Sequence, residues 1–536
     1  MNERHYLLKG TFLLTVAGLL TRAAGFFYKI FLSRTIGAAE IGRFQLTFPV
    51  LAFCSALSCG GIQTAVSRFT AEYYAEKDQK SAIRILACAL FLSITLSTVC
   101  CAALFGGSLW LATYFLLEPS CAPLLQIIAF SLPFSAIHGC LNGFFIGKKN
   151  IPVSAASQLI EQLLRITAVM LFYMIFKKSG RTANANIMAL GQLAGELAAA
   201  LFCIYHLVFG KHQLQEEQMA SPALSVIRRH SFFRLIRRDT KKTLAVSAPL
   251  GLSRMLLCVL QGIEAALLPQ MLGQFGHSSL DALAVYGTLT GMALPLLMFP
   301  TAVTSAIGTL LLPAVSEARA LNQDKKITDT INASFQGSLL LGYFFLTGFL
   351  LFGNDLGTLL FHSSLAGVFT RKLALLCPFV YINTTLISVL HGMGKTAAAS
   401  VWNTAGFCVR LLCILFLVPD IGIDGYFIGM LVSQAFIVVC SLITLHRAVG
   451  FTASLTDALL KPALLCILCG AGLTALRLFC PRFSVPSWGG TLLLAVLFGI
   501  SFLIPCFFLL PQSMLPQKLL RHSRFASTKN HGTRRS

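Results

Sequence analysis

The chain has 536 residues, of which 56% are hydrophobic and only 12% are charged, and its mean hydropathy is +0.76. Soluble globular domains contain about 25% charged residues, so this composition excludes an ordinary soluble protein and indicates a polytopic membrane protein. The formal charge of +22 would suit nucleic-acid binding, but the basic residues lie between apolar segments and no nucleic-acid-binding motif accompanies them. We therefore expect no nucleic-acid partner.

Fourteen segments contain the run of about 20 mostly apolar residues that a helix needs to cross a bilayer. In chain order they are 8–32, 42–66, 83–107, 121–146, 152–176, 185–210, 243–270, 282–307, 328–352, 370–393, 397–419, 425–446, 461–480 and 488–511. Runs such as 339–352 are apolar at nearly every position and lack the alternation of a membrane β-barrel. We therefore predict an all-α fold.

The first apolar segment is long, carries Arg22 and Lys29, and lacks a clear small-residue cleavage site. We expect it to remain as the first span rather than to be removed as a signal peptide. Lys and Arg gather in cytoplasmic loops of membrane proteins. With the amino terminus inside, most of the 42 basic residues fall on the cytoplasmic side, so we expect a multi-pass protein of the cell membrane with both termini cytoplasmic.

Matched features recur in the same order in the two halves of the chain. The pairs are Leu20-Thr21-Arg22 and Leu252-Ser253-Arg254, Phe48-Pro49 and Phe299-Pro300, Gly147-Lys148 and Gly394-Lys395, and Gln158 with Arg165 and Asn403 with Arg410. Spans one to six thus pair with spans seven to twelve. Because six is even, both halves share one orientation, as in transporters built from parallel repeats.

This repeat predicts the domain organisation. Residues 1–210 form an N-terminal six-helix lobe, 211–242 a cytoplasmic basic linker, 243–447 a C-terminal six-helix lobe, 448–511 two extra helices and 512–536 a basic cytoplasmic tail. The linker segment 224–238 mixes apolar residues with arginines. It can lie on the membrane surface as an amphipathic helix or remain a solvated linker. The two extra helices either line an added groove or pad the second lobe.

Several longer stretches resemble a known family. They are Thr21 to Lys29 followed by Ile36-Gly37 and Ile41-Gly42, Gly61 to Glu72, Gly143 to Asn150 running on through Gln158 and Glu161 to Arg165, and Tyr286 to Pro295 followed by Pro300 and Pro313. This pattern resembles the stage V sporulation protein B family, polysaccharide exporters of the multidrug/oligosaccharidyl-lipid/polysaccharide superfamily that are similar to lipid II flippases. The resemblance implies two lobes around a central cavity, alternating access, and movement of a lipid-linked peptidoglycan precursor for spore cortex synthesis.

Two pairs of polar residues are the first candidates for substrate binding. Arg22 and Lys29 lie seven residues apart in span one, hence on one helix face, and Arg254 and Gln261 repeat that spacing in span seven. An ionisable group at membrane depth is costly and suggests a functional site. The planar fork of arginine suits a lipid pyrophosphate. The alternative is that Arg22 and Lys29 snorkel to the membrane surface or pair with a carboxylate.

Spans five and eleven carry the next candidates. Glu161 and Arg165 are four residues apart, a spacing that allows an ion pair within one helix. Arg410 has Gly406 in the corresponding position, so it must find another partner, and we favour it over Arg165 for substrate contact, with Asn403 nearby on the same helix face.

Three acids within spans, Glu161, Glu196 and Glu264, are candidates to bind a coupling proton or sodium ion. Glu196 and Glu264 can instead pair with a cavity arginine. The predicted spans hold more cations than acids, which favours an anionic, lipid-linked substrate. The five cations are Arg22, Lys29, Arg165, Arg254 and Arg410. A cation-coupled multidrug exporter is the alternative function, and a non-transporting scaffold for cortex-synthesis enzymes is a third.

No enzyme motif is evident. Gly394-Lys395-Thr396 resembles the end of a Walker A loop, but Val389 occupies the position of its first glycine. The histidines form no zinc-protease pattern, and no nucleophile elbow is present. Most of the 17 cysteines lie within spans without zinc-site spacing, so we interpret them as packing residues. We expect no cofactor beyond a coupling ion.

Overall fold

The computed structural model describes residues 3–180, 182–209, 229–451, 460–479 and 487–509. These residues form helices and no strand, which confirms the all-α prediction. Twelve continuous helical stretches of the described residues, some of which join two or three of the elements named below, are long and apolar enough to cross a membrane. The number is thirteen if α6 and α7, which meet at a 45° bend, count as one span. This number is roughly consistent with the fourteen predicted spans.

The described helices fall into two compact units. Unit 1 comprises residues 1–299 and 407–429, and unit 2 comprises residues 300–406 and 430–536. Unit 1 contains α1 (Glu3–Thr35), α2 (Ala38–Ser55), η1 (Ala56–Gly60), α3 (Ile62–Ala75), α4 (Gln79–Gly106), α5 (Ser108–Trp110), η2 (Leu111–Phe115), η3 (Pro119–Cys121), α6 (Ala122–Ala129), α7 (Ser131–Gly147), α8 (Ile151–Lys178), α9 (Asn186–Phe209), α10 (Arg229–Phe275), α11 (Ser279–Thr288), η5 (Leu289–Ala293) and α12 (Leu294–Met298). Unit 2 contains α13 (Thr301–Ala320), α14 (Asp324–Phe361), α15 (Ser364–Leu373), η6 (Ala374–Leu376), α16 (Cys377–Gly392), α19 (Lys461–Phe479) and α20 (Trp488–Leu509), and both units share α17 (Thr396–Ile421) and α18 (Ile423–Val449).

The two compact units differ in extent from the two lobes expected from the repeat, and the lobes stay a prediction. Residues 243–299 and 407–429, which the repeat assigns to the second lobe, belong to unit 1. The linker predicted at 211–242 lies partly outside the described residues, and from Arg229 onward it is the first part of α10. The tail predicted at 512–536 lies outside the described residues.

Two predicted spans are divided in the structure: 121–146 bends by 45° between α6 and α7, and 282–307 is interrupted at Pro300. The sequence predicts a single helix over 282–307, but α12 ends at Met298 and α13 begins at Thr301. Pro300 occupies the N-cap position of α13. Proline has no backbone N–H and disfavours helical geometry in the residue before it, so a helix boundary at this position is expected on steric grounds. The matching Pro49 lies inside α2, just before the π-helical turn η1.

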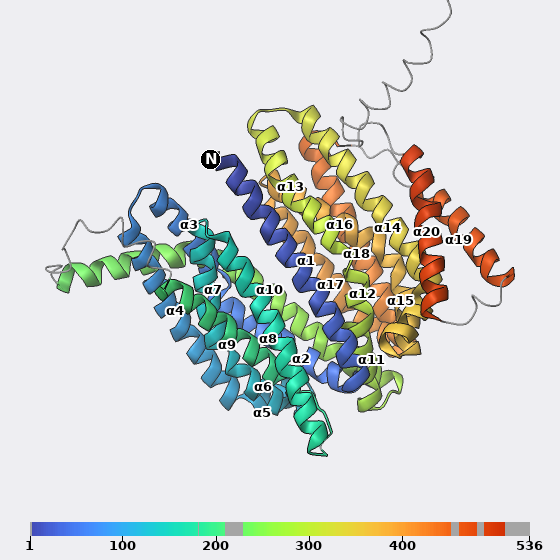
Figure 1. The fold of residues 1–536 in the computed structure, drawn as a ribbon, viewed down its shortest axis with the longest axis horizontal. Helices are drawn as coiled ribbons and strands as arrows, with labels where there is room; N and C mark the ends of the chain where they lie inside the picture. The colour runs from blue at the N-terminus through green and yellow to red at the C-terminus, as the bar shows by residue number, and fades with distance from the viewer. Residues whose placement is uncertain (1–2, 181, 210–228, 452–459, 480–486, 510–536) are drawn as a thin grey trace, which may run out of the picture. The chain divides into compact units, whose positions relative to one another are not determined.

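In unit 1, α7 packs against α3, α4 and α9, while α8 packs against α9 and α1 (Figure 1). Buried apolar side chains of α3, α4 and α7, including Phe69, Ile85 and Phe144, form the core of this region. The start of α10 is fixed to the same helices. Arg84 Nε donates to the fully buried Asp239 Oδ2 at 2.5 Å, and Lys242 Nζ stands 4.4 Å from the centre of the Phe69 ring.

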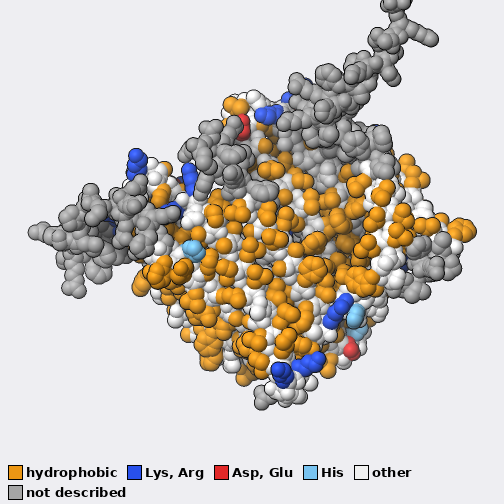
Figure 2. Space-filling model, viewed as in Figure 1, with side chains coloured by type: hydrophobic (Ala, Val, Ile, Leu, Met, Phe, Trp, Pro, Cys, Tyr) orange, Lys and Arg blue, Asp and Glu red, His pale blue; other side chains and the backbone are white. Residues whose placement is uncertain are grey.

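In unit 2, α14 packs against α13, α15, α16, α19 and α20. The two extra helices are attached to it by an apolar cluster that includes Phe352, Phe498 and Phe502. Arg477 of α19 also donates to the carboxylate of Asp355 on α14. Figure 2 shows hydrophobic side chains covering most of the visible face, interrupted by few charged groups, as expected for helices that contact lipid.

Candidate functional site

The contact between α8 and α9 brings together polar side chains from the middle of unit 1. Gly191 and Gly195 of α9 allow this contact, because a Cβ atom at Gly195 would stand 2.8 Å from the carbonyl oxygen of Glu161. A Cβ at Gly191 would stand 2.2 Å from Cγ2 of Val169. Small residues permit such close helix packing in membrane proteins. The close approach places Glu196 of α9 beside Glu161 of α8.

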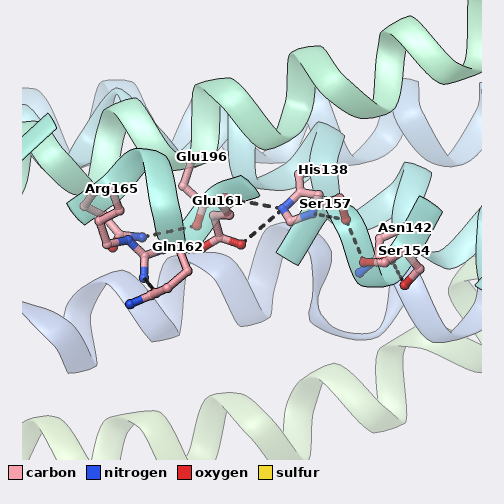
Figure 3. Close-up of polar contacts among 9 residues, drawn as sticks. His138, Asn142, Ser154, Ser157, Glu161, Gln162, Arg165 and Glu196 are labelled. Carbon is pink, nitrogen blue, oxygen red and sulfur yellow. Dashed lines mark hydrogen bonds and ion pairs between the residues drawn. The ribbon is translucent and has the colours of Figure 1, made fainter. Parts of the chain in front are cut away.

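The imidazole of His138 on α7 faces both of these acids (Figure 3). Its Nδ1 is 3.7 Å from Oε2 of Glu161 and 3.7 Å from Oε2 of Glu196. His138 and Glu196 are 7% and 9% exposed, so their charges are poorly solvated. Gln192 donates from Nε2 to Oε1 of Glu196 at 3.2 Å. Three helices therefore direct one imidazole and two carboxylates to a single point.

Arg165 completes this cluster from α8. Its Nη2 donates to Oε1 of Glu161, and its Nη1 donates to Oε1 of Gln162 at 3.1 Å. The ion pair within one helix that the spacing predicts is therefore present. The cluster faces α1, because a Cβ at Gly25 would lie 3.3 Å from Nε2 of Gln162.

The cluster could accept a small cation, since the three ligand atoms of His138, Glu161 and Glu196 lie within 4.8 Å of one another. Donor atoms on a tetrahedral zinc ion about 2.0 Å away are separated from each other by only about 3.3 Å. The separations of 3.7 Å from Nδ1 to each carboxylate are wider. The arrangement does not identify these residues as zinc ligands.

A second buried ion pair lies elsewhere in unit 1. Arg410 Nη2 donates to Oε2 of Glu264 at 2.7 Å, and the hydroxyl of Tyr426 donates to Oε1 of Glu264 at 2.7 Å. The guanidinium carbon of Arg410 also lies 4.3 Å from the centre of the Phe407 ring. The partner that Arg410 requires is thus Glu264. Both carboxylate oxygens of Glu264 accept hydrogen bonds. This arrangement corresponds to the ion pair with a cavity arginine, the alternative to a coupling-ion site.

The remaining candidates make other contacts. Arg22 of α1 is exposed and Lys29 is half-buried, and neither makes an ion pair within the described part of the chain. Arg254 of α10 is exposed and donates from Nη1 to the carbonyl oxygen of Gly60 at 3.2 Å. Gln261 is also exposed. Asn403 donates to the carbonyl oxygen of Ala399 in its own helix at 2.8 Å.

Sequence reasoning missed His138 and Tyr426. His138 carried a usable signal, because a histidine inside an apolar span is itself a costly polar group. Tyr426 carried none, since a tyrosine in an apolar span is ordinary. Its role depends on which side chain faces its hydroxyl.

Comparison with known proteins agrees with this architecture. Over 469 residues the chain is 27% identical to stage V sporulation protein B of Bacillus subtilis (strain 168), covering 86% of this chain and 88% of the relative. Over 471 residues it is 21% identical to the lipid II flippase MurJ of the same organism, covering 83% and 84% of the two chains.

Among solved structures, the lipid II flippase MurJ in an inward closed conformation aligns with a TM-score of 0.69 at 13% identity, covering 92% of this chain and 97% of that one. At this identity the match shows the shared fold. The 21% identical relative and this solved structure are both named as lipid II flippases. Residues 7–319 match the family model described as polysaccharide biosynthesis protein. Because this match spans more than half of the sequence, the chain belongs to the polysaccharide biosynthesis protein family.

Proposed function

We propose that this membrane protein is a flippase that moves a lipid-linked oligosaccharide with an anionic head group across the cell membrane by alternating access. The specific substrate we propose is lipid II, the peptidoglycan precursor, supplied for spore cortex synthesis. The names of the two Bacillus subtilis relatives support this assignment. Cortex-synthesis enzymes would then be the partners that consume the translocated precursor.

The pattern of charge pairing carries the proposal. Of the five cations predicted within spans, Arg165 is paired with Glu161 and Arg410 with Glu264. Arg22, Lys29 and Arg254 have no carboxylate partner among the described residues. Uncompensated cations in apolar helices are expensive and are retained where they serve a function.

The chemistry of these three groups suits a pyrophosphate. A guanidinium donates two parallel hydrogen bonds to phosphate oxygens, and lysine adds a mobile point charge. Arg254 uses Nη1 for the carbonyl of Gly60, which fixes the guanidinium while its other N–H groups remain available. Arg22 and Lys29 supply positive charge from one face of α1.

The proposed topology has both termini in the cytoplasm, with two six-helix lobes of parallel orientation followed by two extra helices. The distribution of Lys and Arg between the loops supports this orientation. Alkaline phosphatase fused after Ser536 should remain inactive in intact cells, because that enzyme folds only outside the cytoplasm. An active fusion would show that the carboxyl terminus lies outside the cytoplasm and would contradict the proposed orientation.

Translocation of lipid II by the purified chain in vesicles tests the function. Arg22→Ala and Arg254→Ala should each abolish translocation, whereas Lys178→Ala, at an exposed lysine that ends α8, should retain it. Arg254→Lys should restore only part of the rate, because lysine cannot donate a planar fork.

Other outcomes would overturn the proposal. Full translocation by both alanine variants would remove the binding role of the arginines. Drug resistance conferred on a sensitive host by the wild-type chain would show a multidrug exporter. Normal cortex in cells carrying the arginine variants, combined with defects when the basic loops are altered, would show a scaffold.

A further inference from the structure

A chain of hydrogen bonds sets the orientation of the His138 imidazole. Ser154 Oγ donates to Oδ1 of Asn142, and Ser157 Oγ donates to the carbonyl oxygen of Ser154 at 2.9 Å. A serine hydroxyl has one proton, so Ser157 Oγ can only accept from His138, whose Nε2 lies 3.2 Å away. In this arrangement Nε2 of His138 is the donor in its contact with Ser157 Oγ, a contact drawn in Figure 3.

This assignment leaves Nδ1 of His138 facing the two carboxylates. In a neutral imidazole with the proton on Nε2, Nδ1 presents a lone pair. That lone pair would then meet Oε2 of Glu161 and Oε2 of Glu196, each at 3.7 Å, so three electron-rich atoms would converge. A proton on Nδ1 converts this repulsion into attraction to both acids.

The charges of the surrounding groups agree. Glu161 and Glu196 contribute two negative charges and Arg165 one positive charge, so the cluster with neutral His138 has a net charge of −1. Within the described part of the chain, the other titratable group near His138 is the Cys59 thiol of η1. An unbalanced charge in a buried site is strongly unfavourable. One proton on His138 makes the cluster neutral.

We propose that His138, Glu161 and Glu196 form a proton-binding site that holds one proton on Nδ1 of His138 between the two carboxylates. A proton balances the charge, whereas a divalent metal ion would leave the cluster with a charge of +1. The inference rests on the geometry of α7, α8 and α9 and is independent of the proposed flippase function.

Protonation of this site joins three helices. His138 is on α7, Glu161 on α8 and Glu196 on α9, so the bound proton supplies attraction across both helix interfaces. Release of the proton restores the net negative charge and removes this attraction. The packing of α7 against α8 and α9 should therefore weaken as the pH rises.

A charge-restoring double variant provides the sharpest test. His138→Gln removes the proton acceptor and leaves the cluster at −1, so its melting temperature in lipid nanodiscs should fall. Adding Glu196→Gln returns the cluster to neutrality without a proton, so the double variant should recover part of the loss. If the decrease in melting temperature of the double variant instead equals the sum of the decreases in the two single variants, His138 has only a packing role and the proposal is wrong.

The pH profile of stability provides a second measurement on the full chain. The melting temperature of the wild type should decrease as the pH rises from about 5 to about 8, the range in which an ordinary histidine changes charge. Glu196→Gln alone should flatten this decrease, because its cluster is neutral with an uncharged His138. This variant keeps the test available if His138→Gln does not fold, and an unchanged slope in Glu196→Gln would overturn the proposal.

Metal binding is a separate outcome of the same assay. If Na⁺ or Zn²⁺ raises the melting temperature of the wild type but not of His138→Gln, the site holds a metal ion and the proton assignment is overturned. No effect of either ion on the wild type supports the proton. These measurements require no lipid II, so they remain informative if the flippase function fails its own test.

Discussion

Replacement of Glu264 by glutamine tests how strongly the buried ion pair holds unit 1 together. The side chains of Arg410 and Glu264 are only 10% and 12% exposed. Removing one partner of such a pair leaves the other charge buried without compensation, which typically costs about 3 to 5 kcal/mol. Glutamine keeps one carbonyl oxygen that can accept from Arg410, and its amide N–H can donate to the Tyr426 hydroxyl, so we expect the lower end, about 3 kcal/mol, for Glu264→Gln.

A thiol-reactive dye provides the assay, because many of the cysteines are buried in the folded chain and become reactive as it unfolds. Glu72→Gln is a matched control, since Glu72 pairs with Arg68 where the two side chains are 41% and 63% exposed. Such exposed pairs contribute at most about 1 kcal/mol.

Double-mutant analysis decides whether the pair itself is responsible. Arg410→Met should also be destabilising, but combining it with Glu264→Gln should cost less than the sum of the two single changes, because neither charge is then left alone. Coupling of about 1 kcal/mol or more is expected for residues in direct contact. Strictly additive losses would refute the reasoning and show that Glu264 and Arg410 contribute to stability independently.

Two further predictions concern packing and capping. Gly195→Ala should lower the melting temperature, because the new Cβ atom would stand 2.8 Å from the Glu161 carbonyl oxygen. The control Gly472→Ala, whose Cβ would meet no atom within 4 Å, should be neutral or stabilising, since alanine favours helix. Equal effects of the two changes would contradict the close contact of α8 with α9. Asp78 caps α4 by accepting from the Ser81 N–H at 3.0 Å, and hydrogen bonds from Ser81 lower its pKa. Asp78→Ala should therefore cost about 1 kcal/mol at neutral pH. Because the folded pKa lies below the unfolded one, this contribution should disappear as the pH falls through the folded pKa. Asp78→Asn should keep the cap without that acid dependence, and a loss of stability equal to that of alanine would refute the capping role.

Helical periodicity predicted those parts of the site that lie within one helix. The Glu161–Arg165 pair follows from a separation of four residues, because the geometry of a helix places such side chains side by side. The absence of an acid at Gly406 correctly indicated that the partner of Arg410 lies elsewhere. That partner, Glu264, is 146 residues away in sequence. Its identity could not be predicted, because it depends on how the helices pack.

The limits of the sequence reasoning have the same physical origin. Hydropathy identified the apolar segment 282–307 but not its division at Pro300, since apolar residues continue on both sides of the boundary. His138 was overlooked because its partners come from α8 and α9, and no local pattern reports contacts between helices. Whether Arg22 and Arg254 bind substrate stays a prediction.

The Glu264–Arg410 pair also has a consequence for biogenesis. Unit 1 is assembled from residues 1–299 and 407–429, so the ribosome must translate residues 300–406 before the chain that completes it exists. During that interval the carboxylate of Glu264 is in an apolar helix without its cation and without the Tyr426 hydroxyl. Closure of unit 1 is therefore a late event in synthesis, whatever the order in which its earlier helices enter the membrane.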